Sequence, residues 1–299
     1  MVEENVEEKT ENPLENGETI GGSEGTGLSS VEEGAGNETL KVPTMAELSA
    51  KGETPDVLFW VGCAGAYDDR YQKVTRDFVK ILHNLNINYA VLGIEESCTG
   101  DPAKRAGNEF VYQMQAMRNI EVMNGYGVKK VITACPHCFN IIKNEYPELG
   151  GAYEVLHHST YLQQLINAGQ LKVRDDGAFK GKTITFHDSC YLGRGNDIYE
   201  APRELLQSLD ANLVEMKRNK SKGLCCGAGG AQMFKDAEKG DREVNIERSE
   251  EALGTQADII ATACPFCMTM MSDGVKHFNK ENEVKVLDLA ELVSTTNNL

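Results

Sequence analysis

The sequence predicts an α/β protein built from two duplicated Rossmann-like βα modules with parallel sheets, preceded by a disordered acidic tail. Three observations predict this architecture: a cysteine pattern that occurs twice, short apolar runs that alternate with helix-like segments around it, and a glutamate-rich N-terminus. We expect the tail at residues 1–50, cysteine-rich module 1 at 51–175 and cysteine-rich module 2 at 176–299.

The tail carries most of the acidic excess of the chain. Residues 1–50 contain twelve Glu, no Asp and two Lys, a net charge of −10 out of −16 for the whole chain. Gly, Ser and Thr fill most of the gaps, so this segment cannot bury enough apolar surface to offset the entropy lost on ordering. We interpret it as a solubilising leader. The few short basic clusters elsewhere do not form the basic face that a nucleic acid needs, and we expect no nucleic-acid partner.

The chain shows neither a run of 18 apolar residues nor the basic-then-apolar layout of a signal peptide. We therefore expect a cytoplasmic protein that reaches a membrane only through another subunit. In that compartment thiols stay reduced, so the nine cysteines favour metal ligands or redox centres over structural disulfides.

The duplication is defined by a Thr-Ala-Cys-Pro-x-Cys sequence that occurs at 133–138 and again at 262–267. Counting back from it, the preceding cysteines lie at intervals of 37 and 35 residues in the first copy and 38 and 36 in the second. This alignment pairs Cys98 with Cys226 and places Ser97 where the second copy has Cys225. The first copy then has four thiols, Cys63, Cys98, Cys135 and Cys138, and the second has five, Cys190, Cys225, Cys226, Cys264 and Cys267.

Each copy reads as strands alternating with helices. In module 1 we expect strands at 57–61, 89–92, 130–133 and 153–156, a helix with apolar residues at helical spacing from 74 to 85, and a helix capped by Ser159 that runs to about 166. In module 2 we expect strands at 183–186, 213–216, 259–262 and 284–287, and a final helix. Each cysteine cluster follows the carboxyl end of a strand, which is where open parallel sheets bind ligands.

The number of thiols limits the chemistry of each site. Five thiolates in module 2 exceed what one tetrahedral zinc ion accepts, so we favour an iron-sulfur cluster there. The four thiols of module 1 fit zinc or a four-iron cluster equally well. His187 precedes a full set of thiolates, and we interpret it as a hydrogen-bond donor beside the ligands rather than a ligand.

On these residues the chain resembles the cysteine-rich domain family of iron-sulfur oxidoreductases, which includes the B subunit of heterodisulfide reductase, the iron-sulfur subunit of glycolate oxidase and iron-sulfur oxidoreductases linked to electron-transfer flavoprotein. The resemblance covers residues 55–293. It implies that the five cysteines of module 2 hold a 4Fe-4S cluster, cubane or noncubane, and that module 1, which departs at Ser97, holds zinc or a second 4Fe-4S cluster. No catalytic residue is assigned.

The resemblance further implies an oxidoreductase subunit that passes electrons between a flavoprotein or ferredoxin-type donor and a quinone or disulfide acceptor. We expect a ferredoxin-type or membrane-anchored partner subunit, because many relatives carry such parts in one chain, and electron-transfer flavoprotein as a further partner. Two alternatives stay open: a zinc-stabilised scaffold or interaction protein, and a thiol-disulfide oxidoreductase. The chain has no Gly-x-Gly-x-x-Gly fingerprint, so we expect no bound NAD or flavin.

Overall fold

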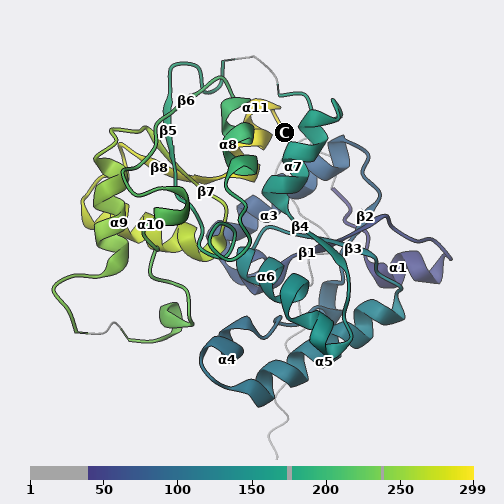
Figure 1. Ribbon diagram of the computed structural model, residues 1–299. Coiled ribbons are helices and arrows are strands. Elements are labelled where there is room, and N and C mark those ends of the chain that lie inside the picture. Colours follow the sequence, from purple (N-terminus) through teal and green to yellow (C-terminus); the bar gives the residue numbers. More distant parts are fainter. Residues whose placement is uncertain (1–39, 174–176, 237–238) are drawn as a thin grey trace, which may run out of the picture.

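Two parallel four-stranded sheets form the framework of the protein (Figure 1). The computed structural model describes residues 40–173, 177–236 and 239–299. The strand order is β2-β1-β3-β4 in the first sheet and β6-β5-β7-β8 in the second, so both sheets have the same topology. All strand pairs are parallel and helices connect them, which confirms the α/β class and the duplication.

The first half of the chain contains the following elements: α1 (Met45–Ala50), β1 (Val57–Trp60), α2 (Gly62–Tyr67), α3 (Asp69–Asn84), β2 (Tyr89–Ala90), η1 (Gly93–Glu95), α4 (Asp101–Arg105), α5 (Glu109–Gly125), β3 (Lys130–Thr133), α6 (Pro136–Asn144), η2 (Tyr146–Leu149), β4 (Glu154–His157) and α7 (His158–Asn167). The second half contains β5 (Thr183–Phe186), α8 (Glu200–Gln207), β6 (Asn212–Leu213), η3 (Lys220–Lys222), η4 (Gln232–Phe234), α9 (Val244–Leu253), β7 (Ile259–Thr262), α10 (Pro265–His277), β8 (Lys285–Asp288) and α11 (Leu289–Thr296).

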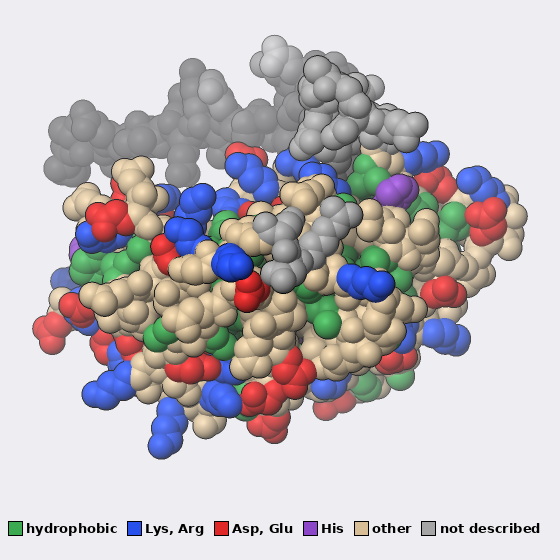
Figure 2. All heavy atoms as spheres, turned by 90° about the horizontal axis from the view of Figure 1, so that it is seen from above, with side chains coloured by type: hydrophobic (Ala, Val, Ile, Leu, Met, Phe, Trp, Pro, Cys, Tyr) green, Lys and Arg blue, Asp and Glu red, His purple; other side chains and the backbone are tan. Residues whose placement is uncertain are grey.

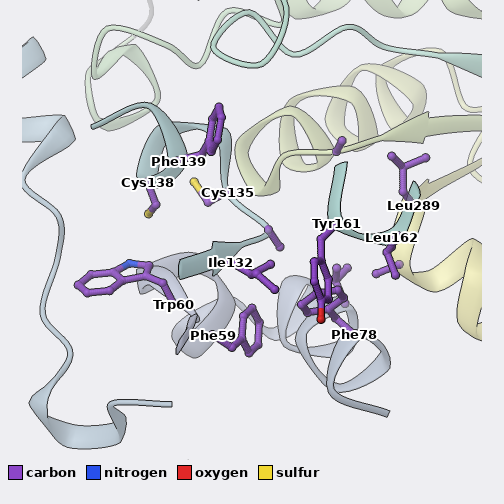
Figure 3. Close-up of a cluster of buried hydrophobic side chains, with 14 of the residues drawn as sticks. Phe59, Trp60, Phe78, Ile132, Cys135, Cys138, Phe139, Tyr161, Leu162 and Leu289 are labelled. Atoms are coloured by element: carbon purple, nitrogen blue, oxygen red, sulfur yellow. The ribbon is translucent and has the colours of Figure 1, made fainter. Parts of the chain in front are cut away.

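The strands are apolar because both faces of each sheet are covered. All four residues of β1 and of β7 are buried, as expected for central strands of a parallel sheet with helices on either side. The helix α3 has a strongly amphipathic sequence, and the residues of its apolar side, among them Leu82, are buried. Figure 3 shows Phe78 of this side within the core.

Helices of one half pack against helices of the other. The C-terminal helix α11 packs against α3 of the first half, and α7, which ends the first half, packs against α8 of the second. One hydrophobic core continues through both halves. The helices α6 and α10, which begin with the two Cys-Pro-x-Cys sequences, meet in the middle (Figure 1).

The N-terminal boundary that we expected at residue 50 is wrong. Residues 40–50 are folded: Thr44 caps α1 in a capping box with Glu47, and Met45 and Leu48 are buried. Thr44 also pairs with Val91 beside the first sheet. The prediction of disorder for 1–39 lies outside the described residues.

Element boundaries differ from expectation at several points. The outer strands β2 and β6 contain two residues each instead of four, because the chain leaves the sheet early to form the loops that carry cysteines. The cap of α7 is His157, not Ser159; the His157 side chain accepts a hydrogen bond from the Ser159 backbone N–H. The division into modules at 51–175 and 176–299 stays a prediction, although each sheet lies within one of these ranges.

Basic and acidic side chains are interspersed on the face shown in Figure 2, with apolar atoms between them. In the described part of the chain, no helix combines the length and the apolar character needed to span a bilayer.

Candidate metal centres

The cysteines of each half gather at the carboxyl edge of its sheet, as the sequence predicts. Cys63 and Cys135 follow β1 and β3, and Cys190 and Cys264 follow β5 and β7. All nine cysteines are free. Cys135 and Cys264 are the N-cap residues of α6 and α10, each with Pro at the first helical position. Their sulfurs therefore lie beside free backbone N–H groups, which favour the thiolate form.

The first site, called site 1 below, consists of Cys63, Cys98, Cys135 and Cys138. All four line one recess of the surface, together with His137 and Phe266. Cys63 donates a hydrogen bond to Cys98, which lowers the pKa of Cys98 to about 6. Burial opposes ionisation of Cys135, but the hydrogen bond from Cys138 and two backbone N–H groups bring the pKa of Cys135 down to about 7.

The second site, called site 2 below, consists of Cys190, Cys225, Cys226, Cys264 and Cys267. Neighbouring thiols of this set influence each other's pKa, in the order Cys190, Cys225, Cys226, Cys267 and Cys264, so the five thiols converge on one place. The Cys226 and Cys267 sulfurs lie 3.3 Å apart. The neighbouring thiols of Cys190 and Cys226 lower the pKa of Cys225, and burial raises the pKa of Cys264 to about 11.

The structure pairs the cysteines of the two sites differently from the alignment made on the sequence. The Gly100 N–H donates to the Cys98 sulfur at 3.5 Å, and the Gly227 N–H donates to the Cys225 sulfur at 3.3 Å. These two glycines have nearly equal positive φ angles, +88° and +92°. Cys98 therefore corresponds to Cys225, and both lie 35 residues after the first cysteine of their module.

The residue that replaces the fifth cysteine in module 1 is consequently Thr99, and the assignment of that place to Ser97 is wrong. Thr99 and Cys226 are both 3 % exposed, and the Thr99 hydroxyl lies 3.9 Å from the Cys138 sulfur, as Cys226 lies beside Cys267. The Ser97 hydroxyl instead donates to the Asn119 side chain at 2.8 Å. Aligning the two glycines, rather than the nearest cysteines, would have found this from the sequence.

The two sites lie side by side. The thiolate charge of Cys135 contributes to raising the pKa of Cys264, so the ends of β3 and β7 are within electrostatic reach of each other. His137, which lies between two cysteines of site 1, is buried and does not face outward; its Nδ1 is 2.9 Å from the Asp101 carboxylate. The His137 ring contacts Tyr191 and Phe266 of module 2, with centroids 4.7 and 4.9 Å apart.

Two buried ring nitrogens on residues three positions before the first cysteine of each site lack a hydrogen-bond partner among the described residues. One is Nε2 of His187, and a ring nitrogen of His187 lies within 4.8 Å of the Cys226 and Cys267 sulfurs. Burial and the nearby Arg248 lower the pKa of His187 to about 3, so the ring is neutral. The other is Nε1 of Trp60, which the sequence analysis did not single out, although it is the only Trp and aligns with His187 in the repeat.

The donor set of site 2 fits an iron-sulfur group. Soft thiolates select zinc or iron-sulfur clusters over hard cations, and five convergent thiols exceed the tetrahedral set of zinc. The Gly227 N–H donates to the Cys225 sulfur, and a ring nitrogen of His187 lies within 4.8 Å of the Cys226 and Cys267 sulfurs, as is usual around metal-bound thiolates. Site 1, with four thiols and Thr99 in the fifth place, fits either zinc or a cluster.

The fold and the two sites define an α/β protein with a duplicated thiol-rich centre. The chain belongs to the cysteine-rich domain family, whose profile matches residues 57–143 and 184–272.

Among proteins that it resembles, the probable iron-sulfur-binding oxidoreductase FadF of Bacillus subtilis is 42% identical over 255 residues, 85% of this chain and 36% of FadF. EtfAB:quinone oxidoreductase of Syntrophomonas wolfei is 40% identical over 252 residues, 82% of this chain and 35% of that protein. One subunit of the dihydromethanophenazine:CoB–CoM heterodisulfide reductase of Methanosarcina barkeri is 36% identical over 248 residues, 80% of this chain and 58% of its own length. The chain thus spans little more than a third of the first two.

Proposed function

We propose that this protein is an iron-sulfur electron-transfer subunit of an oxidoreductase. The observation that carries the proposal is the convergence of five free thiols at site 2, where the Cys226 and Cys267 sulfurs lie 3.3 Å apart, because this is one donor more than a single tetrahedral metal ion uses. In this proposal the five cysteines of module 2 hold a 4Fe-4S cluster. When bound, such a cluster supplies a one-electron redox centre, and the protein holds it, shields it from water and sets its potential.

The surroundings of site 2 support a fixed redox centre. Cys190 follows Asp188, whose carboxylate accepts two hydrogen bonds from the Arg203 guanidinium at 2.8 and 2.9 Å. Both side chains are 4 % exposed. Asp188 also accepts the backbone N–H of Lys220, in the loop that leads to Cys225. This buried pair therefore ties together the two loops that bring Cys190 and Cys225 to the site.

The proximity of the two sites supports transfer through the chain. With the sites within electrostatic reach of each other, an electron accepted at one could pass to the other without a further carrier. We propose that site 1 holds a second 4Fe-4S cluster or a zinc ion, and only the cluster would make it part of this route.

The names of the relatives support the choice of donor and acceptor classes. Their names connect this family with electron-transfer flavoprotein, quinone and heterodisulfide. We propose a flavoprotein or ferredoxin-type donor, a quinone or disulfide acceptor, and a partner subunit that brings this chain to the membrane where the acceptor is a quinone.

Metal content tests the proposal. Iron, acid-labile sulfide and zinc would be measured on anaerobically purified protein and on the matched variants Cys190→Ser, at site 2, and Cys63→Ser, at site 1. We expect about four irons and four sulfides per cluster, lost from site 2 only in Cys190→Ser. Zinc in both sites, with no iron even after reconstitution, would refute electron transfer and favour the scaffold. A protein that binds neither metal yet reduces disulfides would favour the thiol-disulfide alternative.

A further inference from the structure

The same position of the repeat precedes the first cysteine of each site by three residues. Trp60 lies three residues before Cys63, and His187 lies three residues before Cys190. Both residues end the first strand of their module or follow it directly, and both are completely buried. The duplication therefore places two different nitrogen-containing rings in one structural position.

Both rings present a nitrogen that has no partner among the described residues. A buried N–H without an acceptor is costly, so each such group in a folded protein calls for an explanation. The Tyr89 hydroxyl, in the outer strand β2, also lacks a partner within the described part of the chain, but Tyr89 is not near the cysteines in sequence. What distinguishes Trp60 and His187 is that they are ring nitrogens at the same position of the repeat, three residues before Cys63 and Cys190.

Arg248 decides which nitrogen of His187 carries the proton. The buried Arg248 donates from Nε to Nδ1 of His187 at 3.0 Å. Since a guanidinium has only donors, Nδ1 must accept, and the proton of the neutral ring is on Nε2. Arg248 is itself held by the Arg218 carbonyl and the Glu251 carboxylate. The structure thus fixes Nε2 as the N–H donor of a ring that has a nitrogen within 4.8 Å of the Cys226 and Cys267 sulfurs.

Trp60 needs no neighbour that fixes the position of its ring proton, because an indole nitrogen is always a donor. Figure 3 shows the nitrogen-bearing edge of the Trp60 ring turned toward Cys138. Cys138 is the counterpart of Cys267, so the sulfur toward which Trp60 is turned is equivalent to one that lies near His187.

We propose that His187 and Trp60 are positioning residues that each donate one N–H to a metal-bound sulfur, His187 at site 2 and Trp60 at site 1. The inference rests on the proposed function for the presence of a cluster in site 2. A donor to sulfur stabilises the reduced, more negative cluster and raises its reduction potential. At site 1 the same donor stabilises metal-bound thiolate, whichever metal is present.

The variants His187→Phe and His187→Gln test the proposal at site 2. Phe removes the donor, and Gln places an amide N–H near the position of Nε2. With iron retained, we expect the reduction equilibrium of the site-2 cluster to shift about tenfold against the reduced form in His187→Phe, which is 59 mV for one electron. We expect His187→Gln to restore most of it. Tyr89→Phe, which removes an unpartnered hydroxyl away from the thiols, is the matched control and should leave the potential unchanged.

Pulsed electron paramagnetic resonance on the reduced protein with ¹⁵N-labelled histidine gives a second, independent measurement on the unmutated chain. A weak nitrogen coupling is expected from a hydrogen-bonded ring. A strong coupling would show that His187 is a ligand, and no coupling would show that it does not contact the cluster; either overturns the proposal, even where His187→Phe fails to hold iron. Protein without any iron would instead refute the proposed function.

At site 1, Trp60→Phe is compared with Tyr89→Phe for the release of metal to a chelator. Loss of a group that supports metal ligands typically weakens binding by about tenfold or more, and we expect a shift of that size in Trp60→Phe alone. Equal release from the two variants, both folded, would overturn the assignment of Trp60.

Discussion

The structural equivalence of Thr99 and Cys226 predicts that the five-thiol site can be moved from one module to the other. The two side chains are equally buried, and they have equivalent neighbours: Thr99 lies beside Cys138, and Cys226 lies beside Cys267. A cysteine at 99 would place a fifth sulfur where the Thr99 hydroxyl now lies, 3.9 Å from the Cys138 sulfur. A threonine at 226 would leave module 2 with the four-thiol set of module 1.

The structural cost of these exchanges is small enough for both variants to fold. Thr99→Cys deletes one buried methyl group, which lowers the free energy of unfolding by about 1 kcal/mol. For a folded unit of this size, that corresponds to about 2–4 °C in the melting temperature. Cys226→Thr adds a methyl group at a position that is 3 % exposed, and overpacking there costs about 1–3 kcal/mol. Cys226→Ala, which adds nothing, separates overpacking from the loss of the thiol.

The assay is the paramagnetic signal characteristic of the five-thiol cluster, integrated per chain after anaerobic reconstitution with iron and sulfide. We expect one such signal in the unmodified protein, two in Thr99→Cys and none in Cys226→Thr or Cys226→Ala. The double exchange should restore one signal, now carried by module 1, which Cys63→Ser would then abolish.

Two results would refute the reasoning. If Ser97→Cys creates the second signal and Thr99→Cys does not, the equivalence of Thr99 and Cys226 is wrong. If Cys226→Thr and Cys226→Ala leave the signal unchanged at full iron content, Cys226 is not a ligand.

Two further predictions concern the packing that holds the sites. The buried Asp288 carboxylate joins the two halves, because it accepts hydrogen bonds from His158 Nε2 at 2.8 Å and from the Tyr71 hydroxyl at 3.1 Å. In denaturant unfolding, Asp288→Ala should lower the free energy of unfolding by about 3–5 kcal/mol, and the exposed control Asp273→Ala by less than about 0.5 kcal/mol. Similar values for the two variants would contradict a role of Asp288 in joining the halves. In Gly274→Ala the new Cβ would lie 1.9 Å from Ser249 Oγ, so α9 and α10 must separate, which lowers the free energy of unfolding by about 1–3 kcal/mol. Adding Ser249→Gly should restore stability, and Gly125→Ala, with open space around the new Cβ, is the control. A lack of rescue would show that this contact does not set the spacing of the two helices.

The fold was predictable because the signals were local and repeated. The apolar runs at 57–60, 130–133, 183–186 and 259–262 each became a central strand, and the cysteines after them reached one edge as parallel topology requires. The helix α1 was missed because the acidic, polar composition of 1–50 outweighed the short capping-box sequence at 44–47. Its stability comes from burying Met45 and Leu48, which is a tertiary contact that composition does not reveal.

The sites were predictable in membership but not in correspondence. Which cysteines gather follows from the strand ends, whereas the pairing of Cys98 with Cys225 depends on backbone conformation. A loop that must turn through a positive φ at Gly100 or Gly227 fixes which preceding side chain faces the site. Counting cysteine intervals gave an answer wrong by one residue, because the loop after Cys98 differs in length between the modules. His187 was recognised from its place beside thiolates, and Trp60 was not, because an aromatic residue at the end of a strand is usually core.

Duplication kept the scaffold and changed the residues that face sulfur. Equivalent positions hold Thr99 and Cys226, Trp60 and His187, and, between the two sites, His137 and Phe266. Each exchange alters charge, donor capacity or ligand number at a site while the strands and their order stay the same. In the proposed function with a cluster at each site, two clusters with identical surroundings would have equal potentials and no preferred direction of transfer between them. The differences at these three pairs are therefore the means by which one fold, used twice, can present two unequal centres side by side.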